Sequence, residues 1–398
     1  MVSSKLIVRD FGPIRHIEVE FRKLTLFIGP QGSGKSTIAK LFSMFVWLEK
    51  RLLRGLLDKE ELKKDSRFQY DFCGYHRLSS YFQKSTFIEF IGQAYVFIFD
   101  GGQLKISETA RHNNIEVYKV MYVPSERNLL SVVNDFSAIK ALPKSLLTFK
   151  EEFVMASRRF AKGFKLPIND SCFYYDKSTG TSWLRGETFR IKLADASSGF
   201  QAATPLLLVS GYLTGMVMDS NKGDKGGLND DELEKLKKKV KIILDNRTLL
   251  PELREAALSV LSSQFKYSGF VNIVEEPEEN LFPASQQRVL YELMRCCNSL
   301  DSNQLILTTH SPFMINYLTI AVKAHELLTK GVKRMDMEKI IDPDVGINIK
   351  DIAVFQLKDG GGKRLEESYG LPSDGNYLNS ALEEANEMFA ELEDLEFS

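Results

Sequence analysis

The chain has 398 residues, of which 43% are hydrophobic and 26% are charged, and its 52 Lys and Arg nearly balance 53 Asp and Glu for a net charge of −1. This profile is ordinary for a globular protein; it excludes a low-complexity disordered chain and a globally basic nucleic-acid-binding surface, leaving only local patches. Four cysteines without a C-x-x-C pair argue against a disulfide scaffold or cysteine metal site and favour buried thiols in a cytoplasmic protein.

The predicted elements of the first half begin with strands. Residues 4–11 and 17–28 alternate like two strands of a hairpin-like start, without the apolar core of a signal peptide. The remaining expectations for this half are a mainly helical segment at 37–92, a hairpin at 94–108 turning at Gly101 and Gly102, a strand running into a loop at 115–128, helices at 129–165, and alternating strands and turns at 172–199.

The second half is predicted to contain a linker-like patch, "SNKGDKGGLN" at 220–229, followed by a charged helix at 230–246. Apolar strands are expected at 269–275 and in "QLILTTHSP", and an acidic amphipathic helix at 378–397. We expect the apolar stripe of that last helix to face the body; partner docking is the alternative. The absence of a long heptad run excludes a long coiled-coil arm, and no stretch is expected to span a membrane.

The stretch "GPQGSGKS" has the spacing of a phosphate-binding loop, G-x-x-x-x-G-K-[ST]. An apolar strand precedes it and an apolar-periodic helix follows, so backbone N–H groups and the helix dipole would face phosphate oxygens. Lys35 would reach the β- and γ-phosphates of ATP, and Ser36 would ligate Mg²⁺. The nucleotide-binding residues are therefore Gly29, Pro30, Gln31, Gly32, Ser33, Gly34, Lys35, Ser36 and Thr37.

Two adjacent carboxylates end the strand at 269–275. Neighbouring strand residues face opposite sides, so we assign Glu275 to the Mg²⁺ shell and Glu276 to orienting the attacking water. The alternative is a solvated acidic turn, "EEPEE".

Two further segments point to phosphate contacts. Ser197, Ser198 and Gly199 precede a long apolar helix, where hydroxyls and free N–H groups form a second anion site. A single subunit has no evident use for a second site, so we expect this serine loop to close on the γ-phosphate held by a partner chain; the alternative is a plain helix cap. His310 follows a later strand, at the edge where α/β sheets bind ligands, and would contact the γ-phosphate or the water.

Taken in chain order, the P-loop, the serine loop, the carboxylate pair and His310 resemble the Walker A, signature, Walker B and switch-histidine motifs of ABC-type ATPase heads, in the branch containing RecF, SMC heads and OLD-like ATPases. The segments "EEPEENLFP" and "YVPSER" resemble forms found in AAA-family ATPases of anti-phage systems of the Septu and PARIS kind. The resemblance implies an α/β fold with a mixed sheet, a Mg²⁺-dependent ATPase and a nucleotide-dependent homodimer or higher oligomer.

The sequence departs from the family pattern at four points. Phe282 replaces the histidine of L-H-P, Ser198 replaces a glycine, and no glutamine is placed as a Q-loop, although Glu126 or Arg127 lies near that position. The chain also lacks the D-x-D strand of a nuclease, since "DPDVG" at 342–346 reads as a turn.

The resemblance therefore implies a sensor ATPase that controls a separate nuclease or toxin subunit, with no membrane partner. The alternatives are a RecF- or SMC-like DNA-binding repair ATPase, which could use the basic segments at 235–241 and 158–159, a transporter subunit, and a nucleotide-gated scaffold that scarcely hydrolyses ATP. The expected organisation is one composite head over 1–398, with insertions at 37–120 and 129–190, a charged helical insertion at 219–265 and an α/β extension at 320–398.

Overall fold

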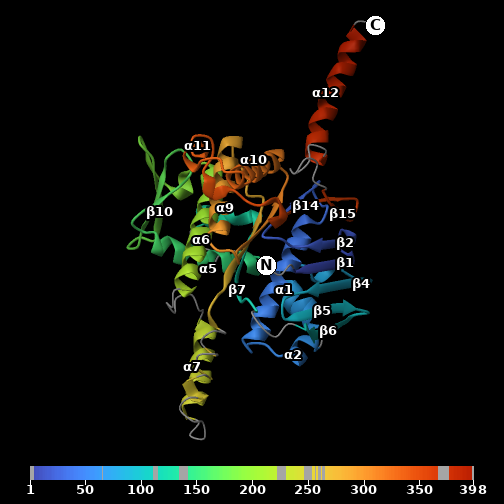
Figure 1. The fold of residues 1–398 in the computed structure, drawn as a ribbon, viewed down its shortest axis with the longest axis vertical. Coiled ribbons are helices and arrows are strands. Elements are labelled where there is room, and N and C mark those ends of the chain that lie inside the picture. The colour runs from blue at the N-terminus through green and yellow to red at the C-terminus, as the bar shows by residue number, and fades with distance from the viewer. Residues whose placement is uncertain are drawn as a thin grey trace.

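A computed structural model describes residues 4–64, 66–110, 115–133, 142–221, 230–245, 253–255, 257–258, 261, 265–365 and 376–396. An 11-stranded mixed sheet forms the centre, and a separate four-stranded sheet lies at one side (Figure 1). The strands of the large sheet are β1 (Lys5–Phe11), β2 (Ile14–Glu20), β3 (Leu24–Ile28), β4 (Phe82–Ile91), β5 (Tyr95–Asp100), β6 (Gln103–Glu108), β7 (Tyr118–Val123), β12 (Gly269–Glu275), β13 (Gln304–Thr309), β14 (Ile352–Lys358) and β15 (Gly361–Arg364).

The small sheet and the helices complete the fold. The small sheet is antiparallel and consists of β8 (Phe164–Lys165), β9 (Cys172–Asp176), β10 (Thr181–Arg185) and β11 (Arg190–Lys192). The helices are α1 (Lys35–Leu53), α2 (Lys59–Lys63), α3 (Cys73–Tyr75), α4 (Leu129–Val132), α5 (Lys144–Arg159), α6 (Ser198–Asn221), α7 (Asp230–Asp245), α9 (Pro283–Asn298), α10 (Pro312–Thr329), α11 (Arg334–Met337) and α12 (Tyr377–Glu396), with short 3₁₀ turns including η3 (Ser125–Asn128) and η5 (Leu193–Asp195).

The large sheet has a parallel half and an antiparallel half. Its strand order is β6-β5-β4-β1-β2-β15-β14-β3-β13-β12-β7, in which β14, β3, β13, β12 and β7 run parallel. Parallel strands place their carboxyl ends at one edge, and in such sheets that edge is where ligands bind. The predicted α/β class with a mixed sheet is therefore confirmed.

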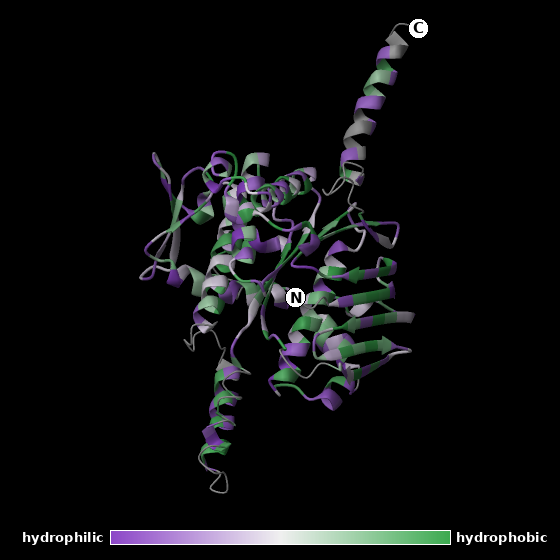
Figure 2. Cartoon of the chain, in the orientation of Figure 1, coloured by the Kyte–Doolittle hydropathy of each residue, from purple (hydrophilic) through white to green (hydrophobic). Residues whose placement is uncertain are grey.

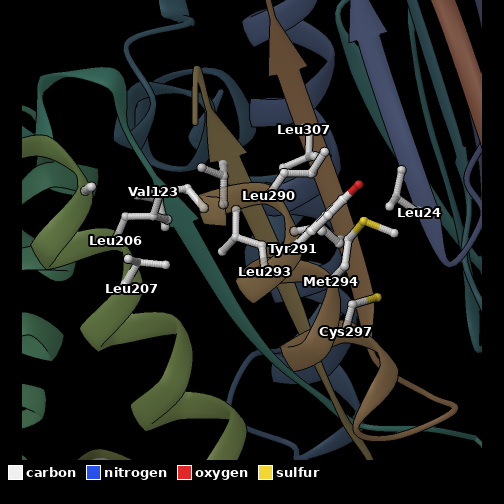
Figure 3. Packing of buried hydrophobic residues seen from close by; sticks show 14 of the residues in the cluster. Leu24, Val123, Leu206, Leu207, Leu290, Tyr291, Leu293, Met294, Cys297 and Leu307 are labelled. Atoms are coloured by element: carbon white, nitrogen blue, oxygen red, sulfur yellow. The ribbon is translucent and has the colours of Figure 1, made fainter. Parts of the chain in front are cut away.

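The parallel strands β3, β12 and β13 are buried along their whole length, which explains their largely apolar sequences. On β3, Leu26 packs into a cluster with α6 and α9, whereas Phe27 packs into a second cluster with α1. Figure 3 shows the first cluster, where α9 side chains such as Leu290 and Met294 lie against the strands. This packing fixes the ends of β3, β12 and β13 relative to α1, and so fixes the edge where the motifs lie.

Several predictions of secondary structure match the structure, and two strand assignments do not. The hairpin at 101–102, the strands β12 and β13, and the turn at 342–346 are confirmed; in that turn, Asp342 pairs with Arg295 at 2.6 Å. The helical prediction for 37–92 is wrong at its end, where β4 is a strand. Buried residues alternate with more exposed ones along the second half of β4, and its backbone pairs with β1. The single strand predicted at 17–28 is two strands, because the chain leaves the β1–β2 hairpin before joining the parallel half as β3.

Helices α7 and α12 project from opposite ends of the molecule, and both alternate hydrophilic and hydrophobic residues along their length (Figures 1 and 2). On α12, Met388, Phe389 and Leu392 are 62–65% exposed. The prediction that its apolar stripe faces the body is wrong for these residues, since nothing in the described body packs on them. The linker-like patch at 220–229 lies almost wholly outside the described residues.

Helix α6 corrects the expectation that no stretch is long enough to span a membrane. Within Ser198–Ser220, an 18-residue window reaches a mean hydropathy of 1.2. By length and composition alone, this helix could cross a membrane. However, 72% of its most apolar 18-residue window is buried inside the protein, where α6 packs on the central sheet. Its apolar character is therefore explained by its place in the core.

Candidate nucleotide-binding site

The phosphate-binding loop connects β3 to α1 through three glycines with positive φ. Gly29, Gly32 and Gly34 have φ of 145°, 74° and 99°, a backbone that other residues adopt only with strain. A Cβ on Gly29 would lie 2.1 Å from the Leu357 carbonyl oxygen of β14, and one on Gly34 would lie 2.1 Å from the Ile14 side chain. The loop is therefore shaped by the neighbouring strands as well as by its own sequence.

Lys35 is buried at the first turn of α1, and its Nζ donates hydrogen bonds to the carbonyl oxygens of Gly29 at 2.8 Å and Pro30 at 2.9 Å. Burial lowers the pKa of Lys35 to about 8, against the opposing effect of Glu276, Glu278 and Glu275. The ammonium group thus lies folded back over the loop, with carboxylates close enough to influence its charge.

The other loop residues differ in exposure. Gln31 and Gly32 are exposed, Pro30 and Ser36 are half-buried, and Ser33 and Thr37 are buried. The Ser33 hydroxyl is buried without a hydrogen-bond partner. Such an orphaned polar atom carries a cost, which a bound phosphate oxygen could offset.

Glu275 and Glu276 lie at the end of β12 and differ sharply in environment. Glu275 is 4% exposed, accepts a hydrogen bond at Oε2 from the Ser125 backbone N–H at 3.3 Å, and has Oε1 at 3.8 Å from Lys40 Nζ. Lys40 follows Ser36 by one helical turn, so this carboxylate lies beside the N-terminal part of α1. Glu276 instead has φ of +43° and a side chain that is 40% exposed.

His310 follows β13 and lies close to Glu276, with 3.6 Å between His310 Nε2 and Glu276 Oε1. Its backbone N–H and the Thr309 hydroxyl both donate to Glu278 Oε1, each at 2.7 Å. Burial and the nearby Lys35 charge lower the pKa of His310, with Glu276 opposing them, so the imidazole is neutral at pH 7. Lys35, Glu276 and His310 therefore meet at one sheet edge.

The donor set at this edge fits Mg²⁺. Glu275 Oε1 is a buried carboxylate oxygen with no hydrogen-bond partner, and Ser36 offers a hydroxyl on the adjacent helix. Mg²⁺ at nucleotide sites is held by one or two such protein oxygens together with phosphate oxygens and water. Among the described residues no group of three or more His, Cys, Asp or Glu could hold a metal by itself.

The serine loop is exposed and packs on another part of the same chain. Ser197 and Ser198 are exposed, whereas Gly199 is buried and a Cβ there would lie 2.7 Å from the Asn280 carbonyl oxygen. No hydrogen bond or ion pair given for the described residues joins 197–199 to the phosphate-binding loop. The structure thus leaves the two serines facing outward, beside the turn that ends in Phe282, which is 77% exposed.

Arg127 is the residue whose structural role the sequence did not reveal. Its side chain is fully buried and donates four hydrogen bonds to backbone carbonyl oxygens, those of Pro124 (3.2 Å), Ala202 (3.2 Å), Glu275 (2.7 Å) and Glu276 (2.6 Å). It therefore joins the end of β12 to the first turns of α6. The "YVPSER" resemblance and its place near the missing Q-loop pointed toward it. Periodicity gave no signal, because the acceptors of its four hydrogen bonds are main-chain atoms.

Comparison with known proteins gives a partial family match. Residues 1–136 match the family model described as an AAA ATPase domain, and no curated protein matches. The chain is similar to the SMC head domain from Thermotoga maritima, with 12% identity, 92% of this chain and 100% of that chain covered, and a TM-score of 0.38.

Two further solved structures show the same level of similarity. The recombination mediator RecF of the RecFOR pathway has 12% identity, coverage of 92% and 98%, and a TM-score of 0.32. A dimeric ATP-binding cassette in a post-hydrolysis state with ADP and phosphate has 9% identity, coverage of 91% and 100%, and a TM-score of 0.30. These distant likenesses carry no functional conclusion. The fold and the loop themselves define an α/β protein with a P-loop, whose first 136 residues match an AAA ATPase domain.

Proposed function

We propose that this chain is an ABC-type ATPase head that binds ATP and Mg²⁺ at the β3–α1 loop and hydrolyses ATP at the interface of a homodimer. The observation that carries the proposal is the convergence of Lys35, Glu276 and His310 at one sheet edge, while the serine loop is turned outward on α6. A site completed by a second copy would use both features.

Each residue of the site has a separate role in this proposal. Lys35 moves from its two carbonyl acceptors to the β- and γ-phosphates, which are stronger acceptors for an ammonium group. Ser36 and Glu275 would hold Mg²⁺, which would supply positive charge against the phosphate oxygens. Glu276, with His310 beside it, orients the attacking water, and Ser197 of the second copy donates to the γ-phosphate. Phosphoryl transfer depends mainly on such positioning and electrostatics.

The water-orienting role is tested by Glu276→Gln. Because the amide keeps the shape of the side chain but cannot accept a proton, we expect turnover to fall by about 10²- to 10³-fold while ATP still binds. Unchanged turnover would reject this role.

The dimer is tested by mixing two inactive variants, Lys35→Ala and Ser197→Arg. A mixed dimer contains one intact composite site, so an equal mixture should recover about one quarter of wild-type activity if the serine loop acts across the interface. If both residues served the same chain's site, no mixture would recover activity.

For the biological role we propose a regulatory ATPase of an anti-phage complex with a separate nuclease or toxin subunit. This rests on the "EEPEENLFP" resemblance and on the absence of a D-x-D strand in the sequence. The exposed lysines Lys237, Lys238 and Lys241 on α7 support the alternative of a DNA-binding repair ATPase. ATP-dependent nuclease activity that co-purifies from native cells favours the first, and salt-dependent DNA binding by the chain alone favours the second.

A further inference from the structure

A cavity of about 530 Å³ lies away from the phosphate-binding loop, between α5, the small sheet and the turn η5. One wall is a face of α5 that includes Phe153 and Ser157, and the opposite wall is the β9–β10 hairpin with Thr181. Figure 1 shows α5 and β10 on the side of the molecule opposite the antiparallel strands β4–β6. None of the lining residues belongs to the nucleotide site described above.

The lining of the cavity combines polar and apolar side chains. Among the described lining residues, Lys150 and Lys192 are the cationic side chains and Asp195 is the carboxylate. Hydroxyl groups come from the hairpin and from α5, and Tyr175 adds an aromatic ring. The apolar part is formed by Leu130, Val133, Phe153, Val154 and Leu193.

Ser157 gives an independent sign that the cavity is built for a ligand. Its side chain is 1% exposed, it lines the cavity, and its hydroxyl has no hydrogen-bond partner. A buried hydroxyl left without a partner costs free energy, and native structures seldom keep one without a reason. A ligand oxygen would satisfy it.

We propose that this cavity binds a small organic phosphate of about the size of a nucleoside monophosphate. The two lysines and the hydroxyls match a phosphate ester, while the apolar wall and Tyr175 match an attached ring system. Inorganic phosphate alone would leave the apolar wall unused, and the volume lies within the range of small-molecule sites.

Two lining residues of the cavity, Ser131 and Ala194, are hydrogen-bonded to Gln201 at the start of α6. A bound ligand would therefore affect the serine loop that precedes α6. Ser131 Oγ donates to the Gln201 carbonyl oxygen at 2.7 Å, and Gln201 Nε2 donates to the Ala194 carbonyl oxygen at 2.8 Å. Gln201 N–H in turn donates to the Ser197 carbonyl oxygen at 3.0 Å. A ligand that orders Ser131 and Ala194 would therefore order the loop that carries Ser197.

The test is calorimetric titration of the full-length Lys35→Ala variant with AMP, GMP, CMP, UMP, ribose 5-phosphate and inorganic phosphate, each to about 1 mM. The variant lacks the ammonium group of the phosphate-binding loop, so binding to the cavity is measured whether or not the proposed ATPase function is correct. We expect at least one organic phosphate to bind with one site per chain, and inorganic phosphate to bind more weakly.

Two substitutions and a control locate the site. Lys192→Glu, at an exposed position, should weaken binding about tenfold or more, and Ser157→Ala about two- to tenfold. Lys162→Glu is the control. Lys162 is exposed between α5 and β8 and does not line the cavity, so this charge reversal should leave binding within about twofold of the parent. Absence of binding by every organic phosphate, or equal binding by Lys192→Glu and Lys162→Glu, overturns the proposal.

Discussion

The buried guanidinium of Arg127 gives the sharpest prediction about how this site is held together. Arg127→Ala removes four hydrogen bonds from a charged donor and leaves the carbonyl oxygens of Glu275 and Glu276 without that partner. Hydrogen bonds to charged groups contribute about 1.5–3 kcal/mol each, but water entering the space left by the side chain would satisfy part of this loss.

Arg127 Nη2 also lies 3.3 Å from Glu279 Oε2. We therefore expect the free energy of unfolding to fall by about 3–5 kcal/mol, the range found when one member of a buried ion pair is removed. The urea midpoint should fall by about 1 M or more. Arg127→Lys keeps the charge but cannot reach all four acceptors, so its urea midpoint should lie between those of the wild type and Arg127→Ala. Arg67→Ala is the control, because Arg67 pairs with Asp71 and Glu61 at the surface and its loss should leave the midpoint near wild type.

Arg127 should also affect catalysis more than binding. It holds the carbonyl oxygen of Glu276, whose φ of +43° is a strained backbone that must be stabilised by its surroundings. At a temperature where Arg127→Lys is folded, we expect kcat to fall at least about tenfold, with KM changed by less than about threefold. If Arg127→Ala unfolds like Arg67→Ala, or if KM alone changes, the argument is refuted.

Three further predictions concern the loop and α12. Because the pKa of Lys35 is about 8 and only its charged form attracts phosphate, ATP affinity should fall about tenfold between pH 7 and pH 9, whereas Lys35→Arg should show little change, as measured by equilibrium binding; a flat wild-type profile would contradict this. Gly29→Ala should abolish ATP binding because its Cβ would meet the Leu357 carbonyl oxygen at 2.1 Å, whereas Gly32→Ala, with nothing within 4 Å, should cost only about 1–2 kcal/mol of backbone strain; equal effects would reject the steric argument. Phe389→Ser should change the free energy of unfolding by less than about 0.5 kcal/mol, because that side chain is 62% exposed; a loss of 2 kcal/mol or more would show that α12 packs on the body.

Local sequence determined the elements that carry the motifs. The apolar runs at β3, β12 and β13 are recognisable because parallel strands buried on both faces need continuous apolar side chains. The glycine spacing of the loop follows from its positive φ values, which are a property of single residues. Because Lys35, Glu276 and His310 each follow a parallel strand, the sequence could also indicate that they lie at one edge of the sheet.

Other features depend on segments far apart in the chain, and periodicity does not report them. The strand β14 lies beside β3, and its Leu357 carbonyl oxygen approaches Gly29 across more than three hundred residues of chain. The β4 segment lies in the range predicted as helical, although its Phe, Ile and Thr residues favour a strand. It is a strand that pairs with β1.

The sequence by itself thus determined the fold class, the P-loop and the strands that present the carboxylates, because each is specified by side chains within a few residues of one another. Only the tertiary structure decided that Arg127 joins β12 to α6, that the serine loop packs beside Asn280 and faces outward, and that a cavity with an unpartnered Ser157 lies behind it. These features arise from main-chain acceptors and from the spacing between packed elements, neither of which leaves a pattern in the order of residues.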